Sequence, residues 1–274
     1  MAEISAADVM KLRKVTGAGM MDCKSALADA NGDFDRAIEI IREKGKAIAS
    51  KRADREATEG AVIAKVAGKK AGIIVLNCET DFVAQNQGFV DLTNKMLDVA
   101  LASNATNLEG ALALEMDGRT LEAHVTEQTG VIGEKIQLSY FATVEAESVI
   151  AYIHPGNKLA TVVGFNKPEV DVQVAKDVAM QVAAMSPVAV DKDDVPAEIV
   201  AKELEIAKEK FRMEGKPENM LDKISQGALQ KFFKDSTLLN QAYVKDPKIS
   251  IKEFLAQNDK GLTVTSFLRF SLAD

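Results

Sequence analysis

Residues 1–52 carry apolar residues at helical spacing in three short runs. Ser5 and Asp8 form a start signal for the first helix, and the Gly-rich segment 16–19 ends it because glycine adopts conformations that other residues avoid. Asp33 is predicted to cap the third helix and Gly45 to end it. The apolar faces are Val9 and Leu12, then Met20, Cys23, Leu27 and Ala30, and finally Phe34, Ala37, Ile38 and Ile41. We therefore predict a three-helix module, followed by a charged linker at 46–59.

Two later stretches have the pattern of β-hairpins and resemble each other. Residues 62–77 read VIAKVAGKKAGIIVLN and residues 149–166 read VIAYIHPGNKLATVVGFN, and each suggests two strands joined by a short turn. A helical segment follows each hairpin, at 89–103 and at 171–185. An alternating strand should close each unit, with Ile136, Leu138 and Tyr140 in the first and Val264, Leu268 and Phe270 in the second. The pattern predicts an α+β fold with two related antiparallel-sheet-plus-helix subdomains, 53–146 and 147–274.

The second subdomain is interrupted at 188–236 by the pattern of two amphipathic helices. Pro196 marks the start of the first helix, and Gly215 and Pro217 reverse the chain before the second. The two apolar stripes are Val200, Leu204, Ala207 and Phe211, and Leu221, Ile224, Ala228 and Phe232. We predict an antiparallel helical hairpin, a coiled coil, that either carries apolar residues to a partner or folds back on the body.

The composition narrows the function classes. Asp and Glu total 41 against 34 Lys and Arg, for a net charge of −7, whereas a nucleic-acid binder usually shows a basic face. Trp is absent and Tyr occurs three times, so stacking platforms for bases are poorly supplied. No stretch is apolar enough to span a membrane, and no secretory signal is recognisable. The two cysteines, Cys23 and Cys78, fit a reducing compartment. We expect a cytoplasmic protein that binds neither nucleic acid directly nor membranes.

Residues that could carry chemistry are few. The segment 16–19, Thr-Gly-Ala-Gly, lacks the spacing of a phosphate-binding loop. His124 and His154 are the only histidines and have no metal-ligand spacing, so we expect neither a metal site nor a cofactor. Cys78 and His154 could in principle form a nucleophile and base, but no oxyanion signature surrounds Cys78. The sequence therefore favours a protein that is not an enzyme, with a Cys–His hydrolase as an alternative.

The segment Cys-Glu-Thr-Asp-Phe-Val-Ala-Gln-Asn, residues 78–86, follows directly on a predicted apolar strand. Thr80 and Asp81 mark a turn or a helix cap, which places Phe82 at a loop tip or in a first helical turn. Two interpretations remain open. Phe82 could pack on its own domain, or it could be an aromatic wedge beside an acid, presented for insertion into a partner.

The sequence also resembles the elongation factor Ts family. The segment 12–24, LRKVTGAGMMDCK, resembles the family's N-terminal module, which has a ubiquitin-associated-like (UBA-like) three-helix fold. The segment 77–86, NCETDFVAQN, resembles its most distinctive core motif. Residues 130–135, GVIGEK, and the hairpin around His154 resemble further family segments, so the likeness covers nearly the whole chain in one order.

The resemblance implies a guanine-nucleotide exchange factor that binds elongation factor Tu, a GTPase, and has no chemistry of its own. Thr80, Asp81, Phe82 and Val83 match the segment that displaces the partner's Mg²⁺, and Ile132, Gly133 and His154 match positions near that contact. Arg13, Met20, Met21 and Lys24 match residues of the module that grip the GTPase. Val244 matches a contact between the second subdomain and the partner's third domain. The hairpin 188–236 matches a dimerisation element, which implies a homodimer.

The chain departs from the family pattern in two features. Lys245 stands where an apolar residue is frequent, and some members continue past the last strand into a helix that clasps the GTPase, which we do not expect after Asp274. A translation-linked adaptor that binds through the UBA-like module, without exchange activity, remains the alternative function.

Overall fold

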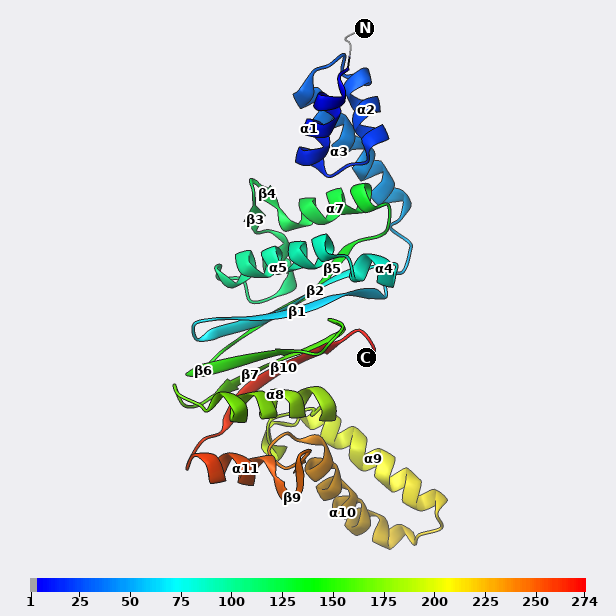
Figure 1. The fold of residues 1–274 in the computed structure, drawn as a ribbon. Coiled ribbons are helices and arrows are strands. Elements are labelled where there is room, and N and C mark those ends of the chain that lie inside the picture. Colours follow the sequence, from blue (N-terminus) through cyan, green and yellow to red (C-terminus); the bar gives the residue numbers. More distant parts are fainter. Residues whose placement is uncertain (1–3) are drawn as a thin grey trace.

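The computed structural model describes residues 4–274, so the first three residues of the predicted 1–52 module lie outside the described part. The chain combines helices with small antiparallel sheets, which confirms the predicted α+β class. The elements form successive layers from the N-terminal helices to the helical hairpin at the opposite end (Figure 1). None of the described helices is long and apolar enough to cross a membrane.

The N-terminal module consists of α1 (Ala6–Thr16), α2 (Met20–Asp29) and α3 (Phe34–Lys51) around a core that includes Leu12, Cys23 and Leu27. The Ser5 hydroxyl caps α1 by accepting a hydrogen bond from the amide of Asp8 at 3.1 Å. Gly17 ends α1 in the left-handed region at φ 71°, and Asp33 caps α3 by accepting from the amide of Arg36. The predicted end of the third helix at Gly45 is wrong, because α3 continues through Gly45 to Lys51.

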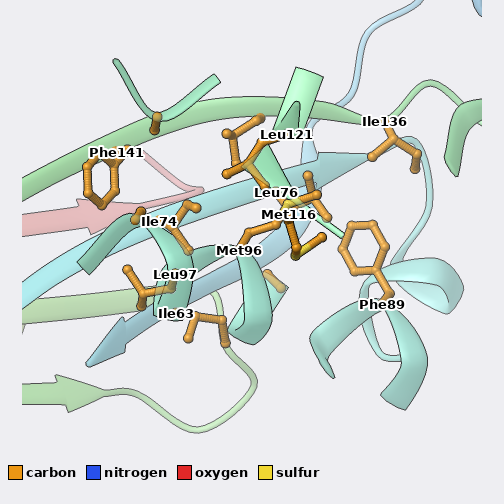
Figure 2. Packing of buried hydrophobic residues seen from close by; sticks show 14 of the residues in the cluster. Ile63, Ile74, Leu76, Phe89, Met96, Leu97, Met116, Leu121, Ile136 and Phe141 are labelled. Atoms are coloured by element: carbon orange, nitrogen blue, oxygen red, sulfur yellow. The ribbon is translucent and has the colours of Figure 1, made fainter. Parts of the chain in front are cut away.

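The first subdomain is a sheet with strand order β1-β2-β5, covered on one face by helices (Figure 1). Its strands are β1 (Glu59–Ala67), β2 (Lys70–Cys78) and β5 (Gln137–Glu145). The intervening elements are α4 (Asp81–Ala84), α5 (Gln87–Leu101), α6 (Leu108–Leu112), β3 (Glu115–Met116), β4 (Arg119–Thr120) and α7 (Leu121–Ile132). Figure 2 shows the core between sheet and helices, where Leu76 and Ile74 of β2 lie near Phe89, Met96 and Leu97 of α5.

The second subdomain repeats this arrangement with strand order β10-β7-β6. Its sheet is made of β6 (Ser148–Ile153), β7 (Leu159–Phe165) and β10 (Val264–Ser271), and α8 (Val172–Met185) covers its outer face (Figure 1). The remaining elements are a 3-10 turn η1 (Lys192–Asp194), β8 (Ala242–Tyr243), β9 (Asp246–Ser250) and α11 (Ile251–Asn258). The inner faces of both sheets share a core that includes Val62, Val75, Ala160 and Val162.

The closing strands β5 and β10 differ from simple alternation in the same way. The β2–β5 register shifts between Val75 and Leu76, and the β10–β7 register shifts between Val264 and Ser266. One extra residue flips the following side chains to the other face of a sheet. Tyr140 and Phe270 therefore leave the faces of Leu138 and Val264 and meet each other between the sheets, with ring centroids 4.8 Å apart. For that reason the prediction that Ile136, Leu138 and Tyr140 share one face of the sheet is wrong, and so is the prediction for Val264, Leu268 and Phe270.

The segment 188–236 contains α9 (Ala197–Met213) and α10 (Glu218–Ser236), which pack antiparallel and project from the body (Figure 1). The apolar face of α10 is shifted by one position from the predicted stripe: after Leu221 the buried residues are Ser225 and Leu229. Met213 and Ile206 of α9 are exposed. The hairpin is thus not packed against the body of the protein along its whole length.

Candidate functional site

The wedge segment, residues 80–83, lies at the end of β2 as a single exposed helical turn. Phe82 is 85% exposed, so the interpretation that its ring packs on its own domain is wrong. Asp81 beside it is also exposed, whereas Ala84 is buried in the core of the first subdomain. The turn is therefore fixed at its base and presents an aromatic ring and a carboxylate to solvent.

The base of the wedge segment is hydrogen-bonded to Glu134, which follows α7. Glu134 Oε2 accepts from the amides of Thr80 at 3.0 Å and Glu79 at 3.2 Å, and Oε1 accepts from the Thr80 hydroxyl at 2.7 Å. The carbonyl of Thr80 accepts from the amide of Ala84 at 3.2 Å and from Cys78 Sγ at 3.1 Å. Every polar group of Thr80 is thus engaged.

A second glutamate ties the wedge segment to the linker after α3. Glu79 Oε1 accepts from the amide of Lys135 at 2.6 Å and from Arg52 Nη1 at 2.7 Å, and Arg55 lies 3.6 Å from Oε2. The bond from the Lys135 amide lowers the pKa of Glu79, and the arginines lower it further against the opposing effect of burial. Lys135 Nζ in turn donates to the carbonyls of Ala53 and Arg55, both at 2.8 Å. We call residues 52–55 the strap. The strap is bonded to Glu79 on one side of the base of the wedge segment and to Lys135 on the other.

The turn after β6 lies at the same edge of the molecule. Glu59 pairs with Cys78 in the β1–β2 register, and Lys158 Nζ lies 2.8 Å from Glu59 Oε2. The bond to Glu59 raises the pKa of Lys158, and the negative charge of Asp81 contributes to that rise. His154 begins this turn, is exposed, and its Nδ1 lies 2.9 Å from the Tyr152 hydroxyl.

The structure thus gathers several predicted site residues from distant segments. The wedge segment, His154, and Ile132 with Gly133 at the end of α7 all belong to this edge, since Gly133 directly precedes Glu134. Gly133 adopts φ 79°, a left-handed conformation that glycine tolerates, and this turn aims Glu134 at Thr80. Sequence reasoning noted residues 130–135 but did not identify Glu79 or Glu134 as supports of the wedge segment.

Other predicted residues lie elsewhere. Arg13, Met20, Met21 and Lys24 are exposed on α1 and α2 of the N-terminal module, separated from the wedge segment by the length of α3 (Figure 1). Met21 is 77% exposed, and Met10 and Val15 of α1 are further exposed apolar residues that the sequence did not single out. Val244 is half-exposed in the second subdomain.

Val244 lies between Tyr243 and Lys245, which both donate to the buried carboxylate of Asp177 in α8. Asp177 accepts from the Tyr243 hydroxyl at 2.5 Å, from Lys245 Nζ at 2.7 Å and from Gln173 Nε2 at 2.7 Å. The amide of Val244 donates to Gln181 Oε1 at 2.9 Å. Lys245, at the position where the family pattern is frequently apolar, is thus engaged within the chain itself.

The arrangement around Cys78 does not support nucleophilic catalysis. Cys78 is fully buried, and burial together with the nearby charge of Glu134 raises the pKa of its thiol to about 12. Its hydrogen bond goes to the carbonyl of Thr80, and the side-chain partner of His154 is Tyr152. In the part of the chain that the structure describes, no three His, Cys, Asp or Glu side chains are grouped to hold a metal.

Comparisons with known proteins agree with one another. A family model described as Elongation factor TS matches residues 79–274. Elongation factor Ts of Porphyromonas gingivalis is 52% identical over 266 residues, which cover 97% of each chain. Elongation factor Ts of Christiangramia forsetii is 53% identical over 276 residues, covering 99% of this chain and 100% of that protein. Elongation factor Ts of Flavobacterium psychrophilum is 50% identical over 275 residues. With half of the residues shared along nearly the entire length, the chain belongs to the elongation factor Ts family of translation elongation factors.

Proposed function

We propose that this chain is a guanine-nucleotide exchange factor that binds elongation factor Tu in its GDP state and promotes release of GDP. The observation that carries the proposal is the exposed Phe82 on a base in which every polar group of Thr80 is bonded. A large aromatic ring held in solvent gains from burial only when another surface covers it, and aromatic anchors of this kind dominate many interfaces.

The proposed mechanism is a coupling between two binding events. GDP and Mg²⁺ stabilise one another on a GTPase through charge and coordination. A factor that binds the empty GTPase more tightly than the loaded form weakens nucleotide binding by the same free energy. Inserting Phe82 between partner side chains, with Asp81 beside it, would displace the elements that hold the metal. The chain itself then needs neither a catalytic group nor a cofactor.

The remaining contacts would supply affinity. The exposed face of the N-terminal module, with Met20, Met21, Arg13 and Lys24, is proposed to grip the GTPase domain, and Val244 to contact the third domain of elongation factor Tu. The hairpin 188–236 is proposed to pair with a second copy of the chain. We propose a cytoplasmic location, where elongation takes place.

The test is a GDP-release assay. Elongation factor Tu loaded with a fluorescent GDP analogue is mixed with excess unlabelled nucleotide and increasing amounts of the chain. Wild type should accelerate release, and Phe82→Ala should lower the maximal rate by about a hundredfold, as expected when a central anchor is removed. Stable binding without acceleration would select the adaptor function instead. Cys78→Ser, which keeps a donor for the Thr80 carbonyl and leaves Phe82 in place, should accelerate GDP release from elongation factor Tu as wild type does.

A further inference from the structure

We propose that Glu134 is a positioning residue for exchange, and that its carboxylate holds Phe82 in the orientation needed for insertion into the GTPase. The inference rests on the proposed function and extends it to a residue outside the wedge segment. Its starting point is the 85% exposure of Phe82. A ring with so little packing of its own takes its direction from the backbone that carries it.

That backbone is fixed at two points. Downstream, Ala84 is buried and Val83 packs against the core of the first subdomain. Upstream, the chain leaves β2 at Cys78 and reaches the turn through Glu79 and Thr80, which lie outside both β2 and α4. These two residues form the covalent connection from the sheet to the turn, and both of their amides donate to one oxygen of Glu134.

A carboxylate suits this position for a chemical reason. The donors that converge here are two backbone amides and one hydroxyl, and an ionised carboxylate is an acceptor only, with room for all three. The Thr80 hydroxyl makes no capping bond to the amides of α4, and it donates to Glu134.

Glu134 is itself held in place by its neighbours. Gly133 turns the chain at φ 79° after α7, and the amide of Lys135 donates to Glu79 Oε1 at 2.6 Å. The two segments therefore exchange bonds: Glu79 accepts from residue 135, and Glu134 accepts from residues 79 and 80. Such a reciprocal pair resists rotation of either segment about its own axis, which is the support that a wedge requires to transmit force.

Removing Glu134 should therefore affect the maximal GDP-release rate and the affinity for the GTPase to different extents. Affinity is spread over the N-terminal module, Val244 and the wedge segment, whereas displacement of the metal depends on the direction of one ring. Loss of the hydrogen bonds to Glu134 lets the turn adopt other orientations, so the Phe82 ring is less frequently oriented for insertion. The maximal release rate should fall far more than the binding of the GTPase.

Three variants test this. Glu134→Ala removes all three acceptor bonds, and Glu134→Gln keeps one carbonyl oxygen for the amides and an amide group that can donate to the Thr80 hydroxyl. The control is Glu147→Ala, which removes a glutamate from an exposed ion pair with Lys69 in the connection between the two sheets. For each variant the maximal GDP-release rate, the dissociation constant for elongation factor Tu, and amide hydrogen exchange at residues 79 and 80 of the free chain are measured.

Glu134→Ala should lower the maximal rate by about tenfold or more and change the dissociation constant by less than about threefold, as for a misplaced reacting group. Glu134→Gln should recover most of the rate, and Glu147→Ala should match wild type. The amides of residues 79 and 80 should exchange faster in Glu134→Ala only. Should Glu134→Ala fail to fold, Thr80→Val, which removes the hydroxyl that donates to Glu134 and keeps the side-chain shape, takes its place, and a rate loss without an affinity loss is again expected.

The proposal is overturned if rate and affinity fall in parallel, or if neither falls. Unchanged protection of the amides of residues 79 and 80 in Glu134→Ala would also overturn it, whatever the release assay shows. If wild type does not accelerate GDP release, the proposed function is wrong. The hydrogen-exchange measurement then still decides whether Glu134 braces the turn.

Discussion

Gly45 of α3 and Gly130 of α7 meet backbone to backbone where the N-terminal module contacts the first subdomain. A Cβ atom at Gly130 would lie 2.3 Å from the Cα of Gly45, whereas a Cβ at Gly45 would lie 3.6 Å from the Cα of Gly130, an ordinary contact distance. The two helices can approach this closely because Gly130 has no side chain, whereas the position of Gly45 leaves room for a methyl group. This asymmetry leads to opposite expectations for the two alanine substitutions.

Gly130→Ala should destabilise the protein by about 2 kcal/mol, because the new methyl group collides with backbone that cannot move without separating the helices. Gly45→Ala should be neutral or stabilise by up to about 1 kcal/mol, because alanine is favoured over glycine inside a helix. Urea unfolding followed by circular dichroism measures both. Equal effects of the two substitutions would show that the helices are not packed at this crossing.

Two phenylalanines in neighbouring turns should respond differently to truncation. Phe82→Ala should change the free energy of unfolding by less than about 0.5 kcal/mol, as for other surface positions. Phe89→Ala removes a ring that is only 4% exposed and should cost about 3 to 4 kcal/mol. Thermal melting of both variants beside wild type checks this, and a large loss for Phe82→Ala would mean that its ring packs within the chain.

Cys78 should be inert in the folded protein. Burial and the charge of Glu134 raise the pKa of its thiol to about 12, so the reactive thiolate is scarce at neutral pH. Iodoacetamide should modify Cys78 in urea but not in buffer, and Cys23, which is also buried, serves as the internal reference. Rapid modification of native Cys78 alone would revive the Cys–His hydrolase alternative.

Asp177 should contribute to stability in a pH-dependent way. Burial by itself raises the pKa of Asp177, but the hydrogen bonds from Lys245, Tyr243 and Gln173 hold it below the ordinary value of 3.8. A carboxyl group with a lowered folded-state pKa stabilises the fold above its unfolded pKa, and this contribution is lost as the pH falls through the folded-state value. The cost of Asp177→Asn should therefore be about 2 kcal/mol near neutral pH and shrink below about pH 3.8.

The check is urea unfolding of wild type and Asp177→Asn at about pH 6 and about pH 3. Asp235→Asn, at an exposed position of α10, is the matched control and should show no difference at either pH. A cost that stays constant with pH would show that the charge of Asp177 is not what holds Tyr243 and Lys245.

The strap, residues 52–55, should become accessible to protease when its anchor is removed. Lys135→Ala deletes the bonds to the carbonyls of Ala53 and Arg55. Because cleavage requires local opening, trypsin should cut after Arg52 and Arg55 about tenfold faster. Lys69→Ala, which deletes an exposed lysine from the first subdomain, should leave the cleavage rate unchanged. Unchanged cleavage in Lys135→Ala would mean that other contacts hold the strap.

Capping residues and hydrophobic patterns along the chain were sufficient to predict most of the helices and strands. Ser5 and Asp33 cap helices as their side chains predict, the hairpins of both sheets begin and end close to the alternating runs, and the exposed turn at Phe82 follows β2 as a Thr-Asp pair suggests. These features depend on residues close together in the chain, which is why pattern and capping chemistry reach them.

The tertiary structure decided the rest, because it depends on which distant segments meet. The sequence pattern predicts a helix end at Gly45, but in the structure α3 continues through Gly45 and packs there against Gly130 of α7. The pattern also places Tyr140 on the same face as Leu138, but a bulge turns it to the other face. Glu134 lies far from Thr80 in sequence, and no spacing rule connects them. The sequence by itself determined that an acidic and aromatic turn follows a strand, whereas only the tertiary fold, which brings the residues after α7 to the end of that strand, supplied the carboxylate that holds the turn in place.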